Sequence, residues 1–317
     1  MRLAGALAVA VVLFVVTPGP ASAQIGVHND VQYGMAGGKP LLLDAYVPPT
    51  PARPGGRAAV VMIHGGGWRT GDKATWADEA NRIAERGWVA FSINYRLDEP
   101  SMFPAEVDDV QTAVRWVRSH AREYGVDPAR VGALGESAGG HLAAMLATLG
   151  SGALDAGARI RVAAAWSPPT DLSALARARG DQWATGVMGC TLSTCADKLA
   201  QASPVTYVDA SDAPLYLVNS SDEQVPLSQA QALNDRLGAV AVDHRLDVLP
   251  GSRHALDYRG DAWAPTLAFL DKYLGAAPAA ADDSSSPAAV VAAVAIVVIL
   301  VAAAGFGVRR VVRQRRR

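Results

Sequence analysis

Cysteine, aromatic residues and charge are all scarce in this chain. Of its 317 residues, 2 are cysteines, 6% are aromatic and 19% are charged. Two thiols with no histidine close to them in the sequence make a weak metal site, so we expect no bound metal. Hydrophobic residues make up 50% of the chain. That share allows a sizeable core, and the length suits one large α/β domain.

Positive charge is also scarce in the middle of the chain. The formal net charge is −1, but seven of the 29 basic residues lie at the two ends, at Arg2 and within residues 309–317. The stretch between them has 22 basic and 30 acidic residues, a net charge of −8. A body of this charge lacks the basic surface that binds nucleic acid, so we expect no nucleic-acid partner.

The N-terminus has the pattern of a secretory signal peptide. A positively charged start precedes a short apolar run, and an A-x-A cleavage site follows at residues 21–23. We therefore predict a leader at residues 1–23 and a mature chain that begins near Gln24. An uncleaved anchor helix is the alternative, although the apolar run is short for a membrane span.

The C-terminus has the pattern of a membrane anchor. Residues 288–308 contain no charge, and a helix of that length spans roughly 31 Å, which matches a bilayer core. The basic tail 309–317 then stays in the cytoplasm, with a nucleic-acid-binding tail as the competing interpretation. Residues 276–287, rich in Ala, Pro, Ser and Asp, predict a flexible stalk. Together these segments predict a single-pass protein of the cell membrane whose globular part, residues 24–275, is extracellular.

The two cysteines agree with export. Cys190 and Cys195 are separated by four residues. In an oxidising compartment they would close a small loop through a disulfide. Free buried thiols are the alternative.

Strand and helix patterns alternate along residues 24–275. Short apolar runs such as 58–63 suit strands buried on both faces, and 104–124 repeats valines at helical spacing. This alternation predicts a mostly parallel sheet with helices on both faces. Residues 168–204 look irregular, contain both cysteines and should form a small cap or lid. We expect strands at 27–33, 41–47, 58–63, 88–95, 130–134, 161–166, 215–219 and 242–249, and helices at 73–86, 104–124, 137–149, 227–237 and 261–274.

The strongest chemical signal is the pentapeptide G-x-S-x-G at residues 135–139, with Ser137 at its centre. It follows an expected strand and opens an expected helix, which is the context that a nucleophilic serine requires. Small residues are needed because the turn is sharp and the backbone crowds itself. The N-terminus of the new helix then directs free N–H groups at the negative charge that develops on a substrate.

A second glycine-rich segment, H-G-G-G-W at residues 64–68, follows the expected strand 58–63. Glycines let backbone N–H groups approach a substrate oxygen, so we predict an oxyanion hole at Gly65, Gly66 and Ala138. A plain glycine-rich turn is the alternative. Three residues of this segment are expected to support the site rather than react: His64, Gly67 and Trp68.

A nucleophilic serine needs a base, and the base needs an orienting carboxylate. With a G-x-S-x-G turn, the three residues follow the chain order serine, acid, histidine. The base is therefore predicted to be His254, in the loop after the expected strand 242–249. His141 lies one turn beyond the serine and His244 lies within a strand. Asp222 follows the expected strand 215–219 and is predicted to be the acid, in preference to Glu223. A solvated loop aspartate is the alternative.

Six short motifs together resemble the esterase/lipase branch of the α/β-hydrolases, and in particular carboxylesterases like hormone-sensitive lipase and feruloyl esterase. They are H-G-G-G-W (64–68), N-Y-R-L (94–97), G-E-S-A-G-G-H-L (135–142), A-S-P-V-T (202–206), D-x-x-V-P (222–226) and G-x-x-H (251–254). The resemblance implies an α/β-hydrolase fold over residues 24–275, a triad at Ser137, Asp222 and His254, and no cofactor. One departure is Asn219, where the family usually has glycine.

Three functions fit these observations. The leading one is hydrolysis of a small-molecule carboxylic ester through an acyl-enzyme. Amide cleavage on the same triad, as in a formamidase or peptidase, is the second. A non-catalytic binding ectodomain is the third, and the presence of a serine, an acid and a histidine at the required positions counts against it.

Overall fold

The computed structural model describes residues 24–52, 54–97 and 103–275. The chain divides into two compact units, Met1–Ala277 and Pro278–Arg317, and the second lies outside the described residues. The expected leader 1–23, stalk, membrane helix 288–308 and basic tail also lie outside them. No helix in the described ranges is long and apolar enough to cross a membrane.

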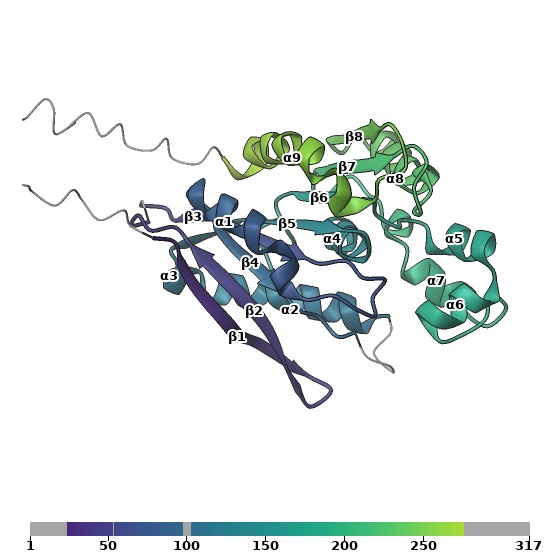
Figure 1. The fold of residues 1–317 in the computed structure, drawn as a ribbon, viewed down its shortest axis with the longest axis horizontal. Coiled ribbons are helices and arrows are strands. Elements are labelled where there is room, and N and C mark those ends of the chain that lie inside the picture. The colour runs from purple at the N-terminus through teal and green to yellow at the C-terminus, as the bar shows by residue number, and fades with distance from the viewer. Residues whose placement is uncertain (1–23, 53, 98–102, 276–317) are drawn as a thin grey trace, which may run out of the picture. The chain divides into compact units, whose positions relative to one another are not determined.

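Eight described strands form one sheet in the order β1-β2-β4-β3-β5-β6-β7-β8 (Figure 1). The first three strands in this order pair antiparallel, and the remaining pairs are parallel. The mostly parallel sheet expected from the sequence is therefore confirmed. The strands are β1 (Gly26–Ala36), β2 (Lys39–Val47), β3 (Arg57–Ile63), β4 (Val89–Ile93), β5 (Val126–Glu136), β6 (Ala163–Trp166), β7 (Leu215–Ser220) and β8 (His244–Leu249).

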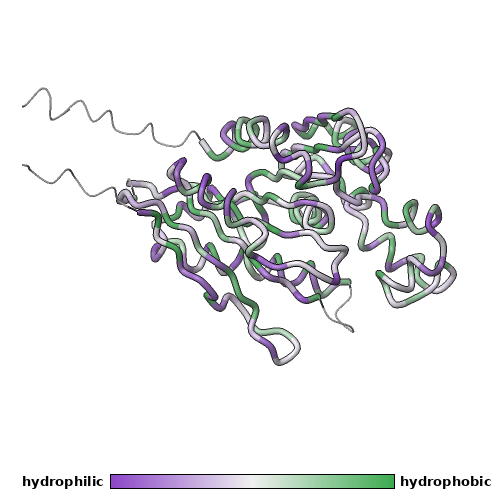
Figure 2. The backbone as a smooth tube through the Cα atoms, viewed as in Figure 1, coloured by the Kyte–Doolittle hydropathy of each residue, from purple (hydrophilic) through white to green (hydrophobic). Residues whose placement is uncertain are grey.

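Helices cover both faces of the sheet, as Figure 1 shows. One apolar core packs α1 (Ala77–Glu85) and α9 (Arg259–Leu274) against the first face. The other core packs α2 (Ala105–Ser119), α3 (Ala121–Tyr124), α4 (Ala138–Thr148) and α8 (Leu227–Ala239) against the second. β3 is buried at every position because both cores cover it, and hydrophobic residues run along the strands in Figure 2.

The segment 168–204 is more regular than expected. It forms three short helices with a small apolar core of their own, α5 (Leu172–Arg179), α6 (Asp181–Met188) and α7 (Ala196–Gln201). Their shortness explains why no helical period was visible in the sequence. Cys190 and Cys195 form a disulfide between α6 and α7, with their Cα atoms 5.6 Å apart, as predicted.

Most other expected elements are present with shifted ends. The expected helix 104–124 is interrupted at His120 and becomes α2 and α3. The expected helix 73–86 opens with a 3₁₀ turn, η1 (Lys73–Trp76), whose N-cap Asp72 accepts the Ala74 N–H. Two further 3₁₀ turns occur, η2 (Pro204–Thr206) and η3 (Ala255–Tyr258).

Candidate active site

The site lies where the parallel strands end. β3 and β5 pair in register at Ile63 and Gly135, so the loop after β3 lies beside Ser137. β5 and β6 pair at Glu136 and Trp166, which places Ser167 on the other side. Because parallel strands share the edge at which they end, segments far apart in the sequence meet there. The same geometry brings the loops after β7 and β8 to this edge.

Ser137 occupies a strained turn between β5 and α4. Its φ of 52° and ψ of −119° are unusual for a residue with a side chain. Its own N–H donates to the Trp166 carbonyl over 2.7 Å. The flanking glycines are required by space, because a Cβ on Gly135 would lie 2.1 Å from the Gly139 carbonyl oxygen, and one on Gly139 would lie 2.1 Å from that of Ile63. The predicted turn of the G-x-S-x-G motif is therefore present.

His254 is the histidine that reaches the serine. Its Nε2 lies 2.9 Å from Ser137 Oγ, and the residue precedes η3 in the loop after β8. His244 instead bonds the carbonyl of Val242 through its Nδ1. The structure thus brings Ser137 and His254 together as the sequence analysis anticipated.

The acid against His254 is Glu223, and the prediction of Asp222 is wrong. Glu223 Oε2 contacts His254 Nδ1, and the Glu223 side chain is fully buried. Its other oxygen, Oε1, accepts hydrogen bonds of 2.8 Å from the Ser220 N–H and the Ser167 hydroxyl. Asp222 is exposed and makes no contact with the imidazole.

Main-chain pairing beyond the end of β7 explains this one-residue difference. The Ser221 N–H donates to the Leu249 carbonyl and the Asp222 N–H donates to the Gly251 carbonyl, so the chain continues along β8 past Ser220. Neighbouring residues of extended chain point to opposite sides. Only one of the two adjacent carboxylates therefore faces His254, and the register places Glu223 inward.

Two residues of this site were missed in the sequence. Ser167 Oγ bonds Glu223, accepts the Ala255 N–H over 2.9 Å and lies 2.7 Å from the Tyr258 hydroxyl. Tyr258 also reaches the Val218 carbonyl over 3.0 Å. The available signal for Ser167 was its place directly after a buried strand. Its φ of 48° and the distant partners are visible only in the fold.

The glycine-rich segment 64–68, the oxyanion loop, differs from expectation at Gly65. The Gly65 N–H donates to Glu136 Oε1, so this predicted donor is not directed at a substrate. Burial raises the pKa of the Glu136 carboxyl. Gly66 and Ala138 remain as candidate donors, because both line the pocket beside Ser137.

His64 and Tyr95 hold the base of that loop. The His64 ring stacks on the Tyr95 ring, with centroids 4.5 Å apart, and the Tyr95 hydroxyl donates to the His64 carbonyl over 3.0 Å. His64 Nδ1 contacts the Gly65 carbonyl, and burial lowers the pKa of the imidazole. His64 therefore takes no part in the contact between Ser137 and His254, and the N-Y-R-L motif supports the loop.

His141 connects the oxyanion loop to the cap. The Trp68 indole N–H donates to His141 Nδ1 over 3.1 Å, and His141 Nε2 lies 2.7 Å from the Ala202 carbonyl. An indole N–H is only a donor, so the Nε2 nitrogen carries the proton. Burial lowers the pKa of His141 to about 4. The ring is therefore neutral near pH 7 and makes both bonds.

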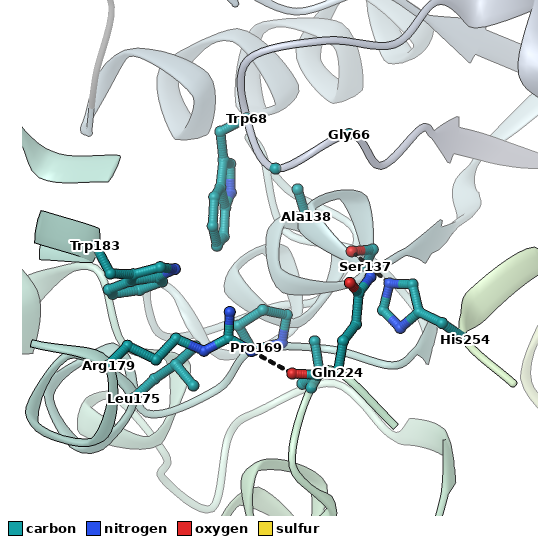
Figure 3. A pocket seen from close by; sticks show the side chains of 12 residues that line it. Gly66, Trp68, Ser137, Ala138, Pro169, Leu175, Arg179, Trp183, Gln224 and His254 are labelled. Atoms are coloured by element: carbon teal, nitrogen blue, oxygen red, sulfur yellow. Dashed lines mark hydrogen bonds between the residues drawn. The ribbon is translucent and has the colours of Figure 1, made fainter. Parts of the chain in front are cut away.

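These residues surround a pocket of about 350 Å³. Figure 3 shows Ser137 and His254 on one side of it, and Trp68, Trp183 and Arg179 on the other. In the described part of the chain, no group of three or more His, Cys, Asp or Glu side chains could hold a metal ion. The lining consists of Gly66, Gly67, Trp68, Ser137, Ala138, Pro169, Leu175, Arg179, Trp183, Gln224, Val225 and His254.

Comparison with known sequences supports an esterase relationship. The profile of the BD-FAE family matches residues 43–237. Esterase LipQ of Mycobacterium tuberculosis is 32% identical over 76% of this chain and 60% of its own length. The probable carboxylic ester hydrolase LipM of that organism is 30% identical over 74% and 58%. The chain thus spans about three fifths of the length of these curated relatives.

Solved structures give the same relationship. Esterase 2 of Thermogutta terrifontis in a propionate-bound form has a TM-score of 0.64 and 27% identity, covering 82% of this chain and 97% of that one. The same esterase phosphonylated by sarin has a TM-score of 0.66 and 26% identity, covering 82% and 98%. Both comparisons therefore relate this chain to an esterase over most of its length.

Proposed function

This chain belongs to the BD-FAE family of α/β-hydrolases, and we propose that it is a serine carboxylesterase with a Ser137–His254–Glu223 triad. The single observation that carries the proposal is the chain of contacts from Ser137 Oγ through both nitrogens of His254 to Glu223. Proteins that lack a hydrolytic function have no need to keep these three side chains aligned across 117 residues of sequence. The esterase names of the relatives support the same reaction.

In the proposed reaction, Ser137 Oγ attacks the ester carbonyl carbon while His254 Nε2 takes the hydroxyl proton. Glu223 holds Nδ1–H and stabilises the imidazolium that forms. The carbonyl oxygen becomes an oxyanion that accepts the N–H groups of Gly66 and Ala138. The ester C–O bond then breaks, and the alcohol leaves with the proton from His254. Water attacks the acyl-enzyme by the same steps in reverse and releases the acid.

The test is active-site labelling together with turnover. A fluorophosphonate probe should label the wild-type protein on Ser137, and 4-nitrophenyl acetate should be hydrolysed. Ser137→Ala should lose labelling and lower kcat by several powers of ten. Ser228→Ala is the matched control, because Ser228 is exposed on α8 and does not line the pocket. Labelling that persists in Ser137→Ala would mean that another residue is the nucleophile.

Amide cleavage is a second candidate for the same triad. It is favoured by a partial similarity to arylacetamide deacetylase of Oryctolagus cuniculus, 45% identical over 29% of this chain and 24% of that protein. A matched pair of substrates separates the two reactions. 4-Nitrophenyl acetate and 4-nitroacetanilide share the acyl group and differ in the leaving atom, so their ratio of kcat/KM measures the preference.

The location of the enzyme is also part of the proposal. The leader pattern at 1–23, the apolar run 288–308 and the arginine-rich tail support an exported catalytic domain with a C-terminal membrane anchor. Protease added to intact cells should then digest the domain and spare a tag placed after Arg317. Loss of that tag from intact cells would reverse the proposed topology.

A further inference from the structure

Arg179 is the single arginine or lysine in the lining of the pocket, and that lining contains no acidic side chain. It is the last residue of α5 and is exposed to solvent. Here its Nη2 donates to the main-chain carbonyl of Gln224, in the loop that carries Glu223. Figure 3 shows the side chain lying across the pocket to reach this carbonyl. The guanidinium is therefore held at the site.

The hydrogen bond to Gln224 uses only part of what the guanidinium offers. Arginine has five N–H donors in a planar fork, and one of them is used by this carbonyl. None of the carboxylates among the described residues forms an ion pair with Arg179. Donors remain for a group that enters the pocket, and a carboxylate fits their geometry better than a neutral oxygen.

The surroundings favour a negative charge at this point. Pro169, Leu175 and Trp183 are apolar neighbours in the lining, and a ligand that packs against them displaces water from the exposed guanidinium, which strengthens the attraction. The two nearby acids lie behind the lining: Glu223 is buried against His254, and Glu136 is bonded to the oxyanion loop. Neither is available to neutralise Arg179.

We propose that the enzyme prefers esters that carry a carboxylate on the acyl or alcohol group, and that Arg179 binds this carboxylate. This inference rests on the proposed esterase function. The contact is local, since residues between the charged ends of the chain have a net charge of −8 and do not attract anions in general. Arg179 lies away from the reacting atoms and acts as a specificity residue.

The experiment compares two matched pairs of substrates. The acyl pair is 4-nitrophenyl butyrate and the mono-4-nitrophenyl ester of glutaric acid. The alcohol pair is 4-acetoxybenzamide and 4-acetoxybenzoate. For each pair, the ratio of kcat/KM, charged over neutral, is measured on one preparation, so that partial misfolding of a variant cancels.

In wild type, at least one of the two ratios should exceed one and should decrease as salt is added. Arg179→Gln should lower that ratio about tenfold or more, because a hydrogen-bonded charge pair is lost. The change should appear in KM for the charged ester rather than in kcat, since the contact is the same in ground and transition states. Arg179→Lys should restore part of the ratio.

Arg177→Gln is the matched control. It removes the same charge from the same helix, and Arg177 is exposed as Arg179 is but does not line the pocket, so both ratios should stay at the wild-type values. Equal ratios in wild type and Arg179→Gln for both pairs, with neutral esters still hydrolysed, would overturn the inference and leave the esterase proposal intact. A wild-type protein that hydrolyses none of the four esters would refute the esterase proposal itself.

Discussion

Glu223 contacts Nδ1 of His254, and Ser137 Oγ lies 2.9 Å from Nε2 of the same ring. The carboxylate is fixed in turn by the Ser220 N–H and the Ser167 hydroxyl. Its oxygens are therefore held before the imidazole becomes charged. A carboxylate in this position fixes the tautomer of the histidine and stabilises the imidazolium.

Glu223→Gln should therefore lower kcat by about 10⁴ at neutral pH, if the precedent of the serine proteases applies. The matched control is Asp222→Asn, which makes the same chemical change one residue earlier, on an exposed side chain. That variant should stay close to wild type. Steady-state kinetics with 4-nitrophenyl acetate measure both, and a larger loss in Asp222→Asn would return the acid to position 222.

Glu136 is expected to act through the oxyanion loop, because its carboxylate accepts the Gly65 N–H. Glu136→Ala removes this acceptor and should displace the neighbouring Gly66 N–H, lowering kcat by about 10²-fold, as for loss of one oxyanion donor. Glu136→Gln keeps an acceptor oxygen and should retain more activity.

Glu85→Gln, at an exposed position on α1, serves as the control for Glu136. The readout is kcat and KM for a neutral ester, together with the thermal midpoint to verify folding. Wild-type kcat in a folded Glu136→Ala protein would show that Gly66 keeps its position without this bond.

His141 should make stability depend on pH. Burial lowers its pKa to about 4, below the usual value of about 6.5 for the unfolded chain. Between these two values the unfolded state binds more protons, so this residue reduces stability as the pH falls from about 6.5 to about 4. The slope from this one group is about 1 kcal/mol per pH unit within that window.

His141→Gln is the test, because a glutamine amide offers both the acceptor for Trp68 and the donor for Ala202 but does not titrate. Urea unfolding should show that lowering the pH from 7 to 5 changes the free energy of unfolding less unfavourably in this variant than in wild type. Glu106 and Asp212, whose pKa values burial raises to about 7, affect both proteins equally. Identical losses would mean that His141 does not titrate in this range.

The disulfide between Cys190 and Cys195 should contribute about 2 kcal/mol to stability, since the closed loop is short. Dithiothreitol should lower the free energy of unfolding of the wild-type protein and leave a Cys190→Ser, Cys195→Ser double variant unaffected. Mass spectrometry without reductant should find no alkylatable thiol. Two alkylated cysteines in the protein purified from an oxidising compartment would contradict the assignment.

The sequence by itself determined the features that depend on neighbouring residues. Ser137 was identified from the five residues around it. Its turn leaves no space for side chains at positions 135 and 139, and both positions are glycine. The buried strands were found because two covered faces demand continuous apolar runs. His254 was found because it is the histidine in a loop after a strand, where the sheet edge places a base.

Only the tertiary structure decided the features that depend on distant partners. Glu223 faces His254 because the chain after β7 stays paired with the loop after β8, about 30 residues away. The Gly65 N–H donates to Glu136, 71 residues later, and so does not contribute to the oxyanion hole. The Arg179 side chain is held at the pocket by a hydrogen bond to the carbonyl of Gln224, 45 residues later. A hydrogen bond depends on the donor–acceptor distance to within tenths of an ångström and on the register of the paired segments. The order of residues in the sequence specifies neither.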